Sequence, residues 1–292
     1  MSRIGVCASL LVALCALVSP AEPVGAPGPE AATSQPAFGC DVLVQGAMDV
    51  EIQPLLDALE GAERIQIAAW TFWKGRIGPQ CVVVSRTEVG PTNASIATVL
   101  GIQRFRPRLV INQGTAGGHV GDLKVGDIVL GSSCIEYGAF TSSHGDAGTG
   151  VKLERWRPRY NRVRFDGEKR TTLRSVPGDE AALAVAEATP YEAGRLVRGR
   201  IGSAHQWNRE LDLIAWNHTK FGTVSEDMES AFAAMAARAL DTRFVAIRII
   251  SDNELLSPDV KISETAPLCA KYVVGVIRNL ARSDTRDGAP RS

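Results

Sequence analysis

A helix followed by a buried strand is predicted for residues 223–252, TVSEDMESAFAAMAARALDTRFVAIRIISD, the stretch that most constrains the fold of this chain. Small and apolar residues recur in its first half at the spacing of one helix face. Thr223 or Ser225 is suited to cap the helix, because short polar side chains satisfy the free N–H groups at a helix start. The acids of EDMES at 226–230 follow, where the helix dipole favours negative charge. The apolar helix face comprises Met228, Phe232, Met235, Ala236 and Ala239.

The second half of the segment, residues 244–250, is rich in β-branched residues and predicts a strand buried on both faces, with Arg248 as its polar exception. The strand ends at Ser251 and Asp252. In parallel α/β sheets, ligands bind beyond the carboxyl ends of the strands. Asp252 and Glu229 are therefore expected at one edge of the sheet, where two carboxylates suit acid–base chemistry or hydroxyl recognition. Ordinary helix capping is the alternative role for these two residues, and on their own they do not exclude it.

Strands and helices alternate along the rest of the chain, which predicts one α/β domain with a parallel or mixed sheet. Glu51 falls at the first strand-to-helix junction, on the side expected for Asp252. Thr92 or Asn93 is expected to cap the second helix, and GTAGG within 113–118 reads as a loop that lets backbone N–H groups approach a ligand. The expected strands are 41–45, 81–85, 109–112 and 196–203, and residues 123–130 are expected to form a turn and a strand. The expected helices are 52–59, 94–105 and 179–187.

The charge balance gives no electrostatic case for nucleic acid or for an anionic membrane, because Lys+Arg and Asp+Glu both number 32 in 292 residues. The arginine-rich stretch 155–164 is accordingly expected to be a solvated loop or a subunit contact. The four histidines lack the spacing of metal ligands, so we predict neither a metal nor another cofactor.

The amino terminus has the pattern of a secretory signal, with one arginine, an apolar run and small residues at a cleavage site. We predict a signal peptide at 1–21, a disordered leader at 22–38, a catalytic domain at 39–283 and a polar tail at 284–292. The protein is then exported, to the periplasm or beyond, and is free of the membrane after cleavage. Buried thiols and disulfides both remain open for the four cysteines of the mature chain, Cys40, Cys81, Cys134 and Cys269.

Five motifs in order resemble the purine nucleoside phosphorylase/nucleosidase superfamily, and within it the methylthioadenosine/S-adenosylhomocysteine nucleosidases. These are GAMDVE at 46–51, NQGTAGG at 112–118, LKVGDIV at 123–129, EDMES at 226–230 and RIISD at 248–252. The resemblance implies a three-layer α/β/α fold around a mixed twisted sheet, as a homodimer. It also implies metal-free hydrolysis of the N-glycosidic bond of an adenine nucleoside, namely 5′-methylthioadenosine or S-adenosylhomocysteine.

The resemblance also implies roles for individual residues. Glu51 matches the acid that activates the attacking water, and Asp252 matches the acid that protonates the purine at N7, beside Ser251. Glu229 matches the carboxylate that binds the ribose hydroxyls, and Arg248 is either a support for the charge of Glu51 or a structural ion pair. The remaining positions implied to contact the nucleoside are Met48, Thr115, Ala116, Gly117, Trp207, Asn208 and Met228.

Two other functions remain as alternatives. A phosphorylase of the same superfamily would need arginines at a phosphate, and Arg76 and Arg86 are the candidates near the site. A secreted, non-catalytic nucleoside-binding or storage protein would have lost the catalytic acids, whereas Glu51, Glu229 and Asp252 are all present. Hydrolysis is therefore the preferred prediction.

Overall fold

The computed structural model of the protein describes residues 39–166 and 169–284. The predicted signal peptide (1–21) and leader (22–38) lie outside the described residues. Helix α6 (Ile262–Asp284) runs one residue past the predicted end of the domain at 283, and the rest of the predicted tail is not described. Within the described ranges, no helix combines the length and the apolar character that a membrane span requires.

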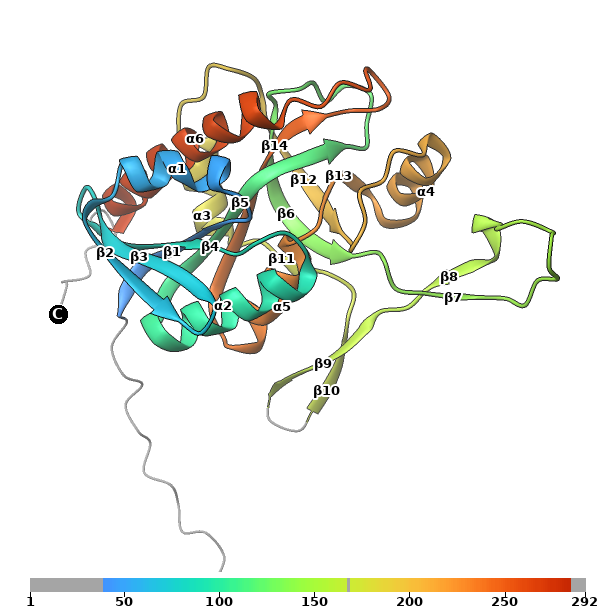
Figure 1. Ribbon diagram of the computed structural model, residues 1–292, viewed down its shortest axis with the longest axis horizontal. Coiled ribbons are helices and arrows are strands. Elements are labelled where there is room, and N and C mark those ends of the chain that lie inside the picture. The colour runs from blue at the N-terminus through green and yellow to red at the C-terminus, as the bar shows by residue number, and fades with distance from the viewer. Residues whose placement is uncertain (1–38, 167–168, 285–292) are drawn as a thin grey trace, which may run out of the picture. The chain divides into compact units, whose positions relative to one another are not determined.

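A mixed sheet of ten strands forms the centre of the fold (Figure 1). Its strands are β1 (Cys40–Gly46), β2 (Glu60–Ile67), β3 (Trp70–Ile77), β4 (Gln80–Arg86), β5 (Pro107–Gly118), β6 (Ile128–Glu136), β11 (Val176–Pro177), β12 (Leu196–Ser203), β13 (Thr223–Asp227) and β14 (Arg243–Asp252). The order is β11-β6-β12-β13-β5-β1-β4-β3-β2, and β14 pairs with both β5 and β6. Strands β5, β14, β6, β12 and β13 thus close into a ring, a feature that no local sequence pattern predicts.

Helices cover both faces of the sheet and give the three layers that the sequence predicts. Helices α1 (Asp49–Asp57), α3 (Glu180–Glu187) and α6 lie on one face, and α2 (Pro91–Phe105) and α5 (Ser230–Ala239) lie on the other (Figure 1). The aromatic residues of α4 (Leu211–Phe221) pack beside the ends of β6 and β12. Fold class and layer order are therefore confirmed.

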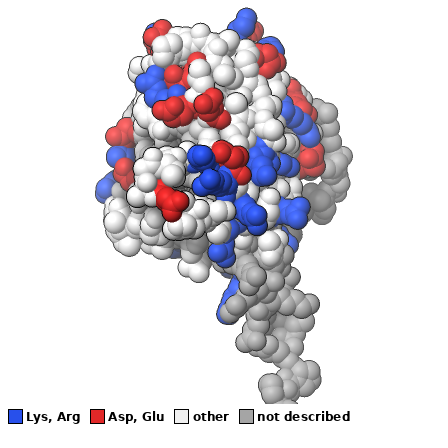
Figure 2. Space-filling view, turned by 90° about the vertical axis from the view of Figure 1, so that its right-hand side faces the viewer, with Lys and Arg blue, Asp and Glu red and all other residues white. Residues whose placement is uncertain are grey.

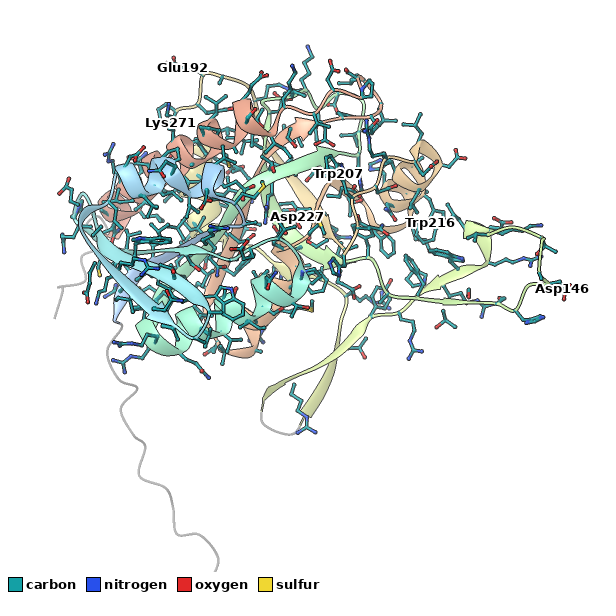
Figure 3. The ribbon with its side chains drawn as sticks, viewed as in Figure 1. Asp146, Glu192, Trp207, Trp216, Asp227 and Lys271 are labelled. Carbon is teal, nitrogen blue, oxygen red and sulfur yellow. The ribbon has the colours of Figure 1, made fainter. Side chains whose placement is uncertain are left out.

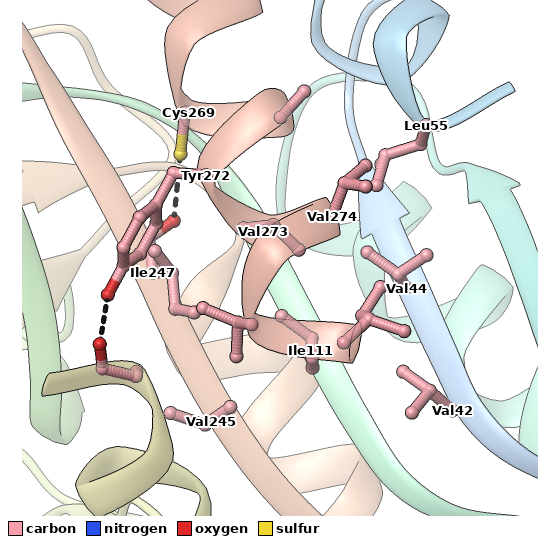
Figure 4. Close-up of a cluster of buried hydrophobic side chains, with 14 of the residues drawn as sticks. Val42, Val44, Leu55, Ile111, Val245, Ile247, Cys269, Tyr272, Val273 and Val274 are labelled. Carbon is pink, nitrogen blue, oxygen red and sulfur yellow. Dashed lines mark hydrogen bonds between the residues drawn. The ribbon is translucent and has the colours of Figure 1, made fainter. Parts of the chain in front are cut away.

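The core follows from strands buried on both faces. Along β1, Val42 and Val44 face the layer of α1 and α6, whereas Leu43 faces the layer of α2 and α5. Figure 4 shows the cluster of buried side chains on the side of α1 and α6, in which Cys269 and Tyr272 of α6 pack over β14. Fully burying one such aliphatic side chain contributes about 1.5–3 kcal/mol, so this packing fixes where the strand ends lie.

The predicted helix start at residues 223–225 is wrong. Residues Thr223–Asp227 form strand β13, because they pair in parallel with β12 and in antiparallel with β5. The helix begins only at Ser230, after Glu229 at its N-cap position. Pairing with two strands that are distant in the sequence outweighs the local helix-capping preference of these residues.

Two other local predictions are corrected. Helix α2 is preceded by Gly90 at its N-cap, with Pro91 in the first turn, and not by Thr92 or Asn93. Residues 113–118 are not a loop, because they continue β5 and pair with β14 and β13. The β2–β3 hairpin, α4 and α6 are additional elements that the sequence patterns did not identify.

Residues 137–166 and 169–175 form short ribbons that extend from the sheet (Figure 1). They comprise β7 (Phe140–Ser142), the 3-10 turn η1 (Leu153–Arg155), β8 (Trp156–Pro158), β9 (Asn161–Asp166) and β10 (Lys169–Leu173). Arg155, Arg157 and Arg159 are exposed here, and Figure 2 shows basic and acidic side chains on the same face. The predicted loop therefore contains strands, while a subunit contact stays a prediction.

The cysteine alternatives are resolved in favour of free thiols. Cys40, Cys134 and Cys269 are buried and Cys81 is half-buried, and none of the four is bonded to another. Burial raises the pKa of Cys40 and of Cys269 to about 12, so both thiols stay protonated at neutral pH.

Candidate active site

Three carboxylates that are distant in the sequence line one cavity of about 210 Å³. Glu51 comes from the first turn of α1, Glu229 from the junction of β13 and α5, and Asp252 from the last position of β14. Their exposures are 1%, 5% and 5%, so solvent scarcely reaches them. The structure thus brings together the three acids that the sequence predicts at one edge of the sheet.

Glu51 is held from both sides by backbone N–H groups. Its Oε2 accepts hydrogen bonds from the N–H groups of Ala47 at 2.7 Å and Met48 at 3.1 Å, which closes the first turn of α1. Its Oε1 accepts from the N–H of Thr115 at 2.9 Å and from its hydroxyl at 3.2 Å. The carboxylate therefore has a fixed orientation at the cavity wall, as a base must have to position a water molecule.

Glu229 reaches away from its own helix. Its Oε1 accepts from the N–H of Gly90 at 2.8 Å, and its Oε2 lies 3.5 Å from Nη1 of Arg248. Burial raises the pKa of Glu229 to about 7, with further raising by the charges of Asp227 and Glu51, while Arg248 opposes the shift. The group can therefore change its protonation state near neutral pH.

Asp252 lies where β14 ends. Its Oδ1 accepts from the Ser251 hydroxyl at 2.6 Å, and the side chain of Trp207 also hydrogen-bonds to it. Burial raises the pKa of Asp252 despite these two bonds. A carboxyl group with a raised pKa is suited to hold a proton and to deliver it to a leaving group. Trp207 itself is 57% exposed, and Figure 3 labels it in the same part of the molecule as Asp227, which also lines the cavity.

A buried ion pair lies behind the cavity. Arg248 contacts Asp227 at 2.8 Å, and both side chains are 1% exposed. The guanidinium also donates to the hydroxyl of Ser230 and to the side chain of Asn112. Burial on its own would lower the pKa of Arg248, but the charges of Asp227, Glu229 and Glu51 raise it instead. Arg248 is therefore a charged centre shared among several acids, and the acid nearest to it is Asp227 rather than Glu51.

Most residues implied by the resemblance line this cavity. Asn208 and Arg248 do not: the N–H of Asn208 donates to Glu226, and Arg248 is buried behind the wall. The residues that do line it are Met48, Glu51, Thr115, Ala116, Gly117, Trp207, Met228, Glu229, Ser251 and Asp252.

Sequence reasoning missed six residues of the cavity wall. The two acids among them, Glu226 and Asp227, were assigned to a helix start, and only strand alternation across TVSED could have separated their directions. The other four carry no pattern that points to a site. The six are Ala47, Val89, Gln206, Glu226, Asp227 and Ile262.

Comparison with known proteins agrees with this geometry. The family model described as "Phosphorylase superfamily" matches residues 41–280. The 5′-methylthioadenosine/S-adenosylhomocysteine nucleosidase of Bacillus thuringiensis (strain Al Hakam) is 27% identical over 257 residues, which cover 82% of this chain and 99% of the relative.

Solved structures of two further nucleosidases of that name are similar over most of their length. The enzyme of Neisseria meningitidis in complex with methylthio-immucillin-A has a TM-score of 0.66 at 25% identity, covering 82% of this chain and 98% of that one. The enzyme of Colwellia psychrerythraea in complex with adenine has a TM-score of 0.67 at 25% identity, covering 83% and 97%. Because the family model spans nearly the whole described domain, the chain belongs to the phosphorylase superfamily.

Proposed function

We propose that the protein hydrolyses the N-glycosidic bond between adenine and a 5′-substituted ribose, with 5′-methylthioadenosine and S-adenosylhomocysteine as its substrates. One observation carries the proposal: Glu51, Glu229 and Asp252 line a single cavity. The names of the relatives, which are nucleosidases for these two compounds, support the choice of substrate.

The three acids divide the reaction between them. As the C1′–N9 bond breaks, Asp252 gives its proton to N7 of the purine, so that the base leaves as a neutral molecule. The sugar then resembles an oxocarbenium ion, which nearby carboxylates stabilise, as in glycoside hydrolysis. Glu229 binds the ribose hydroxyls through its ionised form. Glu51 takes a proton from the water whose oxygen bonds to C1′.

The remaining wall positions bind the nucleoside. Met228 is proposed beneath the sugar and Trp207 against the face of the base, because apolar and aromatic groups favour these flat surfaces. Met48 and the backbone of 115–117 flank the ribose and the water. Ser251 orients the carboxyl group of Asp252 through its 2.6 Å hydrogen bond.

Phosphorolysis is the less favoured reaction because its candidate cations already have partners. Arg86 contacts Asp49 at 2.9 Å and Glu88 at 2.8 Å, and Arg76 donates to the carbonyl of Pro79. Release of free thioribose in phosphate-free buffer is the expected result with 5′-methylthioadenosine. Strict dependence on phosphate, with a sugar 1-phosphate as product, would overturn the assignment to the hydrolases.

Single substitutions test the assignment of the acids. D252N and E51Q are expected to lower the rate of adenine release at least a hundredfold, because each removes a proton transfer worth about 10²–10⁴ in rate. D259N, at an exposed acid, is the matched control and keeps wild-type turnover. Full activity of D252N would contradict the mechanism. Tight nucleoside binding by wild-type protein without any base release would favour a non-catalytic binding protein instead.

The assembly and location are part of the proposal. A homodimer is supported by large apolar side chains left exposed on the surface, among them Leu211, Leu255 and Leu256. Export is supported by the apolar run near the amino terminus. Light scattering after gel filtration should give twice the mass of the mature chain, and fractionation of the native host should recover the protein outside the cytoplasm. A monomer would refute the homodimer, and full-length protein in the cytoplasm would refute export.

A further inference from the structure

A further carboxylate, Glu226 of β13, lines the cavity and has no part in the mechanism above. Its side chain is 7% exposed and lies on the strand position before Asp227. Because successive side chains of a strand point to opposite faces, Glu226 turns away from the Arg248 ion pair that Asp227 makes. A buried acid of this kind needs partners of its own.

One oxygen of Glu226 is fully engaged. Its Oε2 lies 2.9 Å from Nε2 of His119 and accepts from the Tyr137 hydroxyl at 2.5 Å. His119 is in turn fixed by Thr223, whose hydroxyl lies 2.8 Å from Nδ1. Burial, together with the charge of Glu226, raises the pKa of Tyr137 well above its ordinary value, so the phenol keeps its proton and donates. These contacts hold the carboxylate as an acceptor in one orientation.

The other oxygen retains capacity for a ligand. Its one partner among the described residues is the N–H of Asn208, which donates to Oε1 at 3.1 Å. A carboxylate oxygen accepts two hydrogen bonds, so one lone pair of Oε1 is left. The N–H of Asn208, a position that the resemblance implies to contact the nucleoside, is thus committed to Glu226, and the remaining lone pair of Oε1 is the acceptor available to a ligand there.

Glu226 and Asp252 flank the same backbone position, Gly117. A Cβ atom on Gly117 would lie 3.2 Å from Oδ2 of Asp252 and 3.5 Å from Cγ of Glu226. The charge of Glu226 also contributes to the raised pKa of Asp252. Two side chains in these positions contact the same edge of a bound ring.

The purine carries N7 and the substituent on C6 along one edge. If Asp252 donates its proton to N7, the adjacent acceptor of Glu226 meets the group on C6. A 6-amino group donates a hydrogen bond there, whereas a 6-oxo group sets one acceptor against another and leaves both without a partner. A site built around a buried hydrogen bond rejects the analogue that lacks the donor far more strongly than an apolar pocket does.

We propose that Glu226, oriented by His119 and Tyr137, determines base specificity by accepting a hydrogen bond from the 6-amino group of the purine. The site therefore takes 6-aminopurine nucleosides and rejects 6-oxopurine nucleosides. This inference rests on the proposed function, since it assumes that the base lies against Asp252.

Wild-type protein gives the first test, through inhibition of base release by free bases. Adenine is expected to bind at least tenfold tighter than unsubstituted purine or N6,N6-dimethyladenine, which lack the donor, and hypoxanthine is expected to bind most weakly. Purine or hypoxanthine binding as tightly as adenine would overturn the inference. Equilibrium dialysis of the same bases gives this comparison even if no nucleoside is cleaved, so failure of the proposed function remains distinguishable.

A matched pair of variants gives the second test. E226Q should lower the ratio of kcat/KM for adenosine over inosine at least tenfold, because the amide can also donate to a 6-oxo group. E254Q is the control: Glu254 is bound to Arg209 at 2.6 Å and also raises the pKa of Asp252, but it does not line the cavity. E254Q should keep the wild-type ratio. An unchanged ratio in folded E226Q, or an equal loss in E254Q, would refute a direct contact with the base. If E226Q does not fold, the free-base series decides.

Discussion

Replacing Asp227 by asparagine should both destabilise the fold and retune the site. The substitution keeps the side-chain shape but removes the negative charge 2.8 Å from Nε of Arg248, where both side chains are 1% exposed. Removing one partner of a buried ion pair costs about 3–5 kcal/mol, because the remaining charge stays buried. Glu229, 3.5 Å from the same guanidinium, compensates part of that charge, which favours the lower end of the range.

The expected loss of about 3 kcal/mol corresponds to a fall in Tm of roughly 6–12 °C for a domain of this size. Thermal unfolding followed by circular dichroism measures it. The matched control is D241N, in an exposed pair 3.9 Å from Arg238, where the change should stay within about 0.5 kcal/mol. Equal unfolding midpoints for D227N and D241N would show that the buried ion pair does not stabilise the fold.

The same variant should shift the pH dependence of activity. The charge of Asp227 helps to raise the pKa of Glu229, so its removal lowers that pKa. If Glu229 acts as an ionised carboxylate, the acid limb of kcat/KM moves to lower pH in D227N, while D241N keeps the wild-type profile. A limb that does not move would exclude electrostatic coupling between Asp227 and Glu229.

Three further results are expected. In the wild type, kcat/KM should fall as pH drops through about 7, where Glu229 takes up a proton. Because the folded pKa of Glu229 lies above the ordinary 4.5, its contribution to stability is present below about pH 4.5 and is lost as pH rises through 7. Measurements of unfolding against pH should show this loss in the wild type and not in E229Q. G114A should lower turnover at least a hundredfold, because the added Cβ would lie 2.5 Å from Oε1 of Glu51 and 2.7 Å from Nη1 of Arg248, whereas G121A, which meets open space, should be neutral. With Ellman's reagent, half-buried Cys81 should react before Cys40, Cys134 and Cys269 in the native protein, and all four should react in denaturant; resistance in denaturant would indicate a disulfide.

The sequence predicted the site correctly where the place of a residue beside a recognisable strand also sets its position in the fold. Glu51 and Asp252 each stand beside a strand whose apolar run is easy to recognise, and the carboxyl ends of such strands meet at one edge. Their convergence in one cavity therefore followed from the fold class. The buried thiols could not be assigned in the same way, because spacing along the chain does not reveal which cysteines lie near each other.

What local patterns missed depends on pairing between distant segments. TVSED contains both helix-capping residues and a strand alternation, and propensity alone does not decide between them. The pairing of β13 with β12 and β5 decides in favour of the strand. Placing these residues in a helix also concealed that Asp227 lies against Arg248 and that Glu226 lies on the other face.

The register of β13 is what the whole site depends on, and the glycines of β5 allow that register. Glu226 pairs with Gly117, and Ser225 pairs with Gly118. A Cβ atom at Gly118 would lie 2.6 Å from Nδ2 of Asn253, which is itself bonded to the carbonyl groups of Val120 and Leu123. A slip of β13 by one residue would exchange the faces of Glu226 and Asp227 and leave Arg248 without its nearest acid. The glycines in the motif therefore serve close packing between β5, β13 and the segment after β14, and the acids reach the nucleoside cavity because that packing holds.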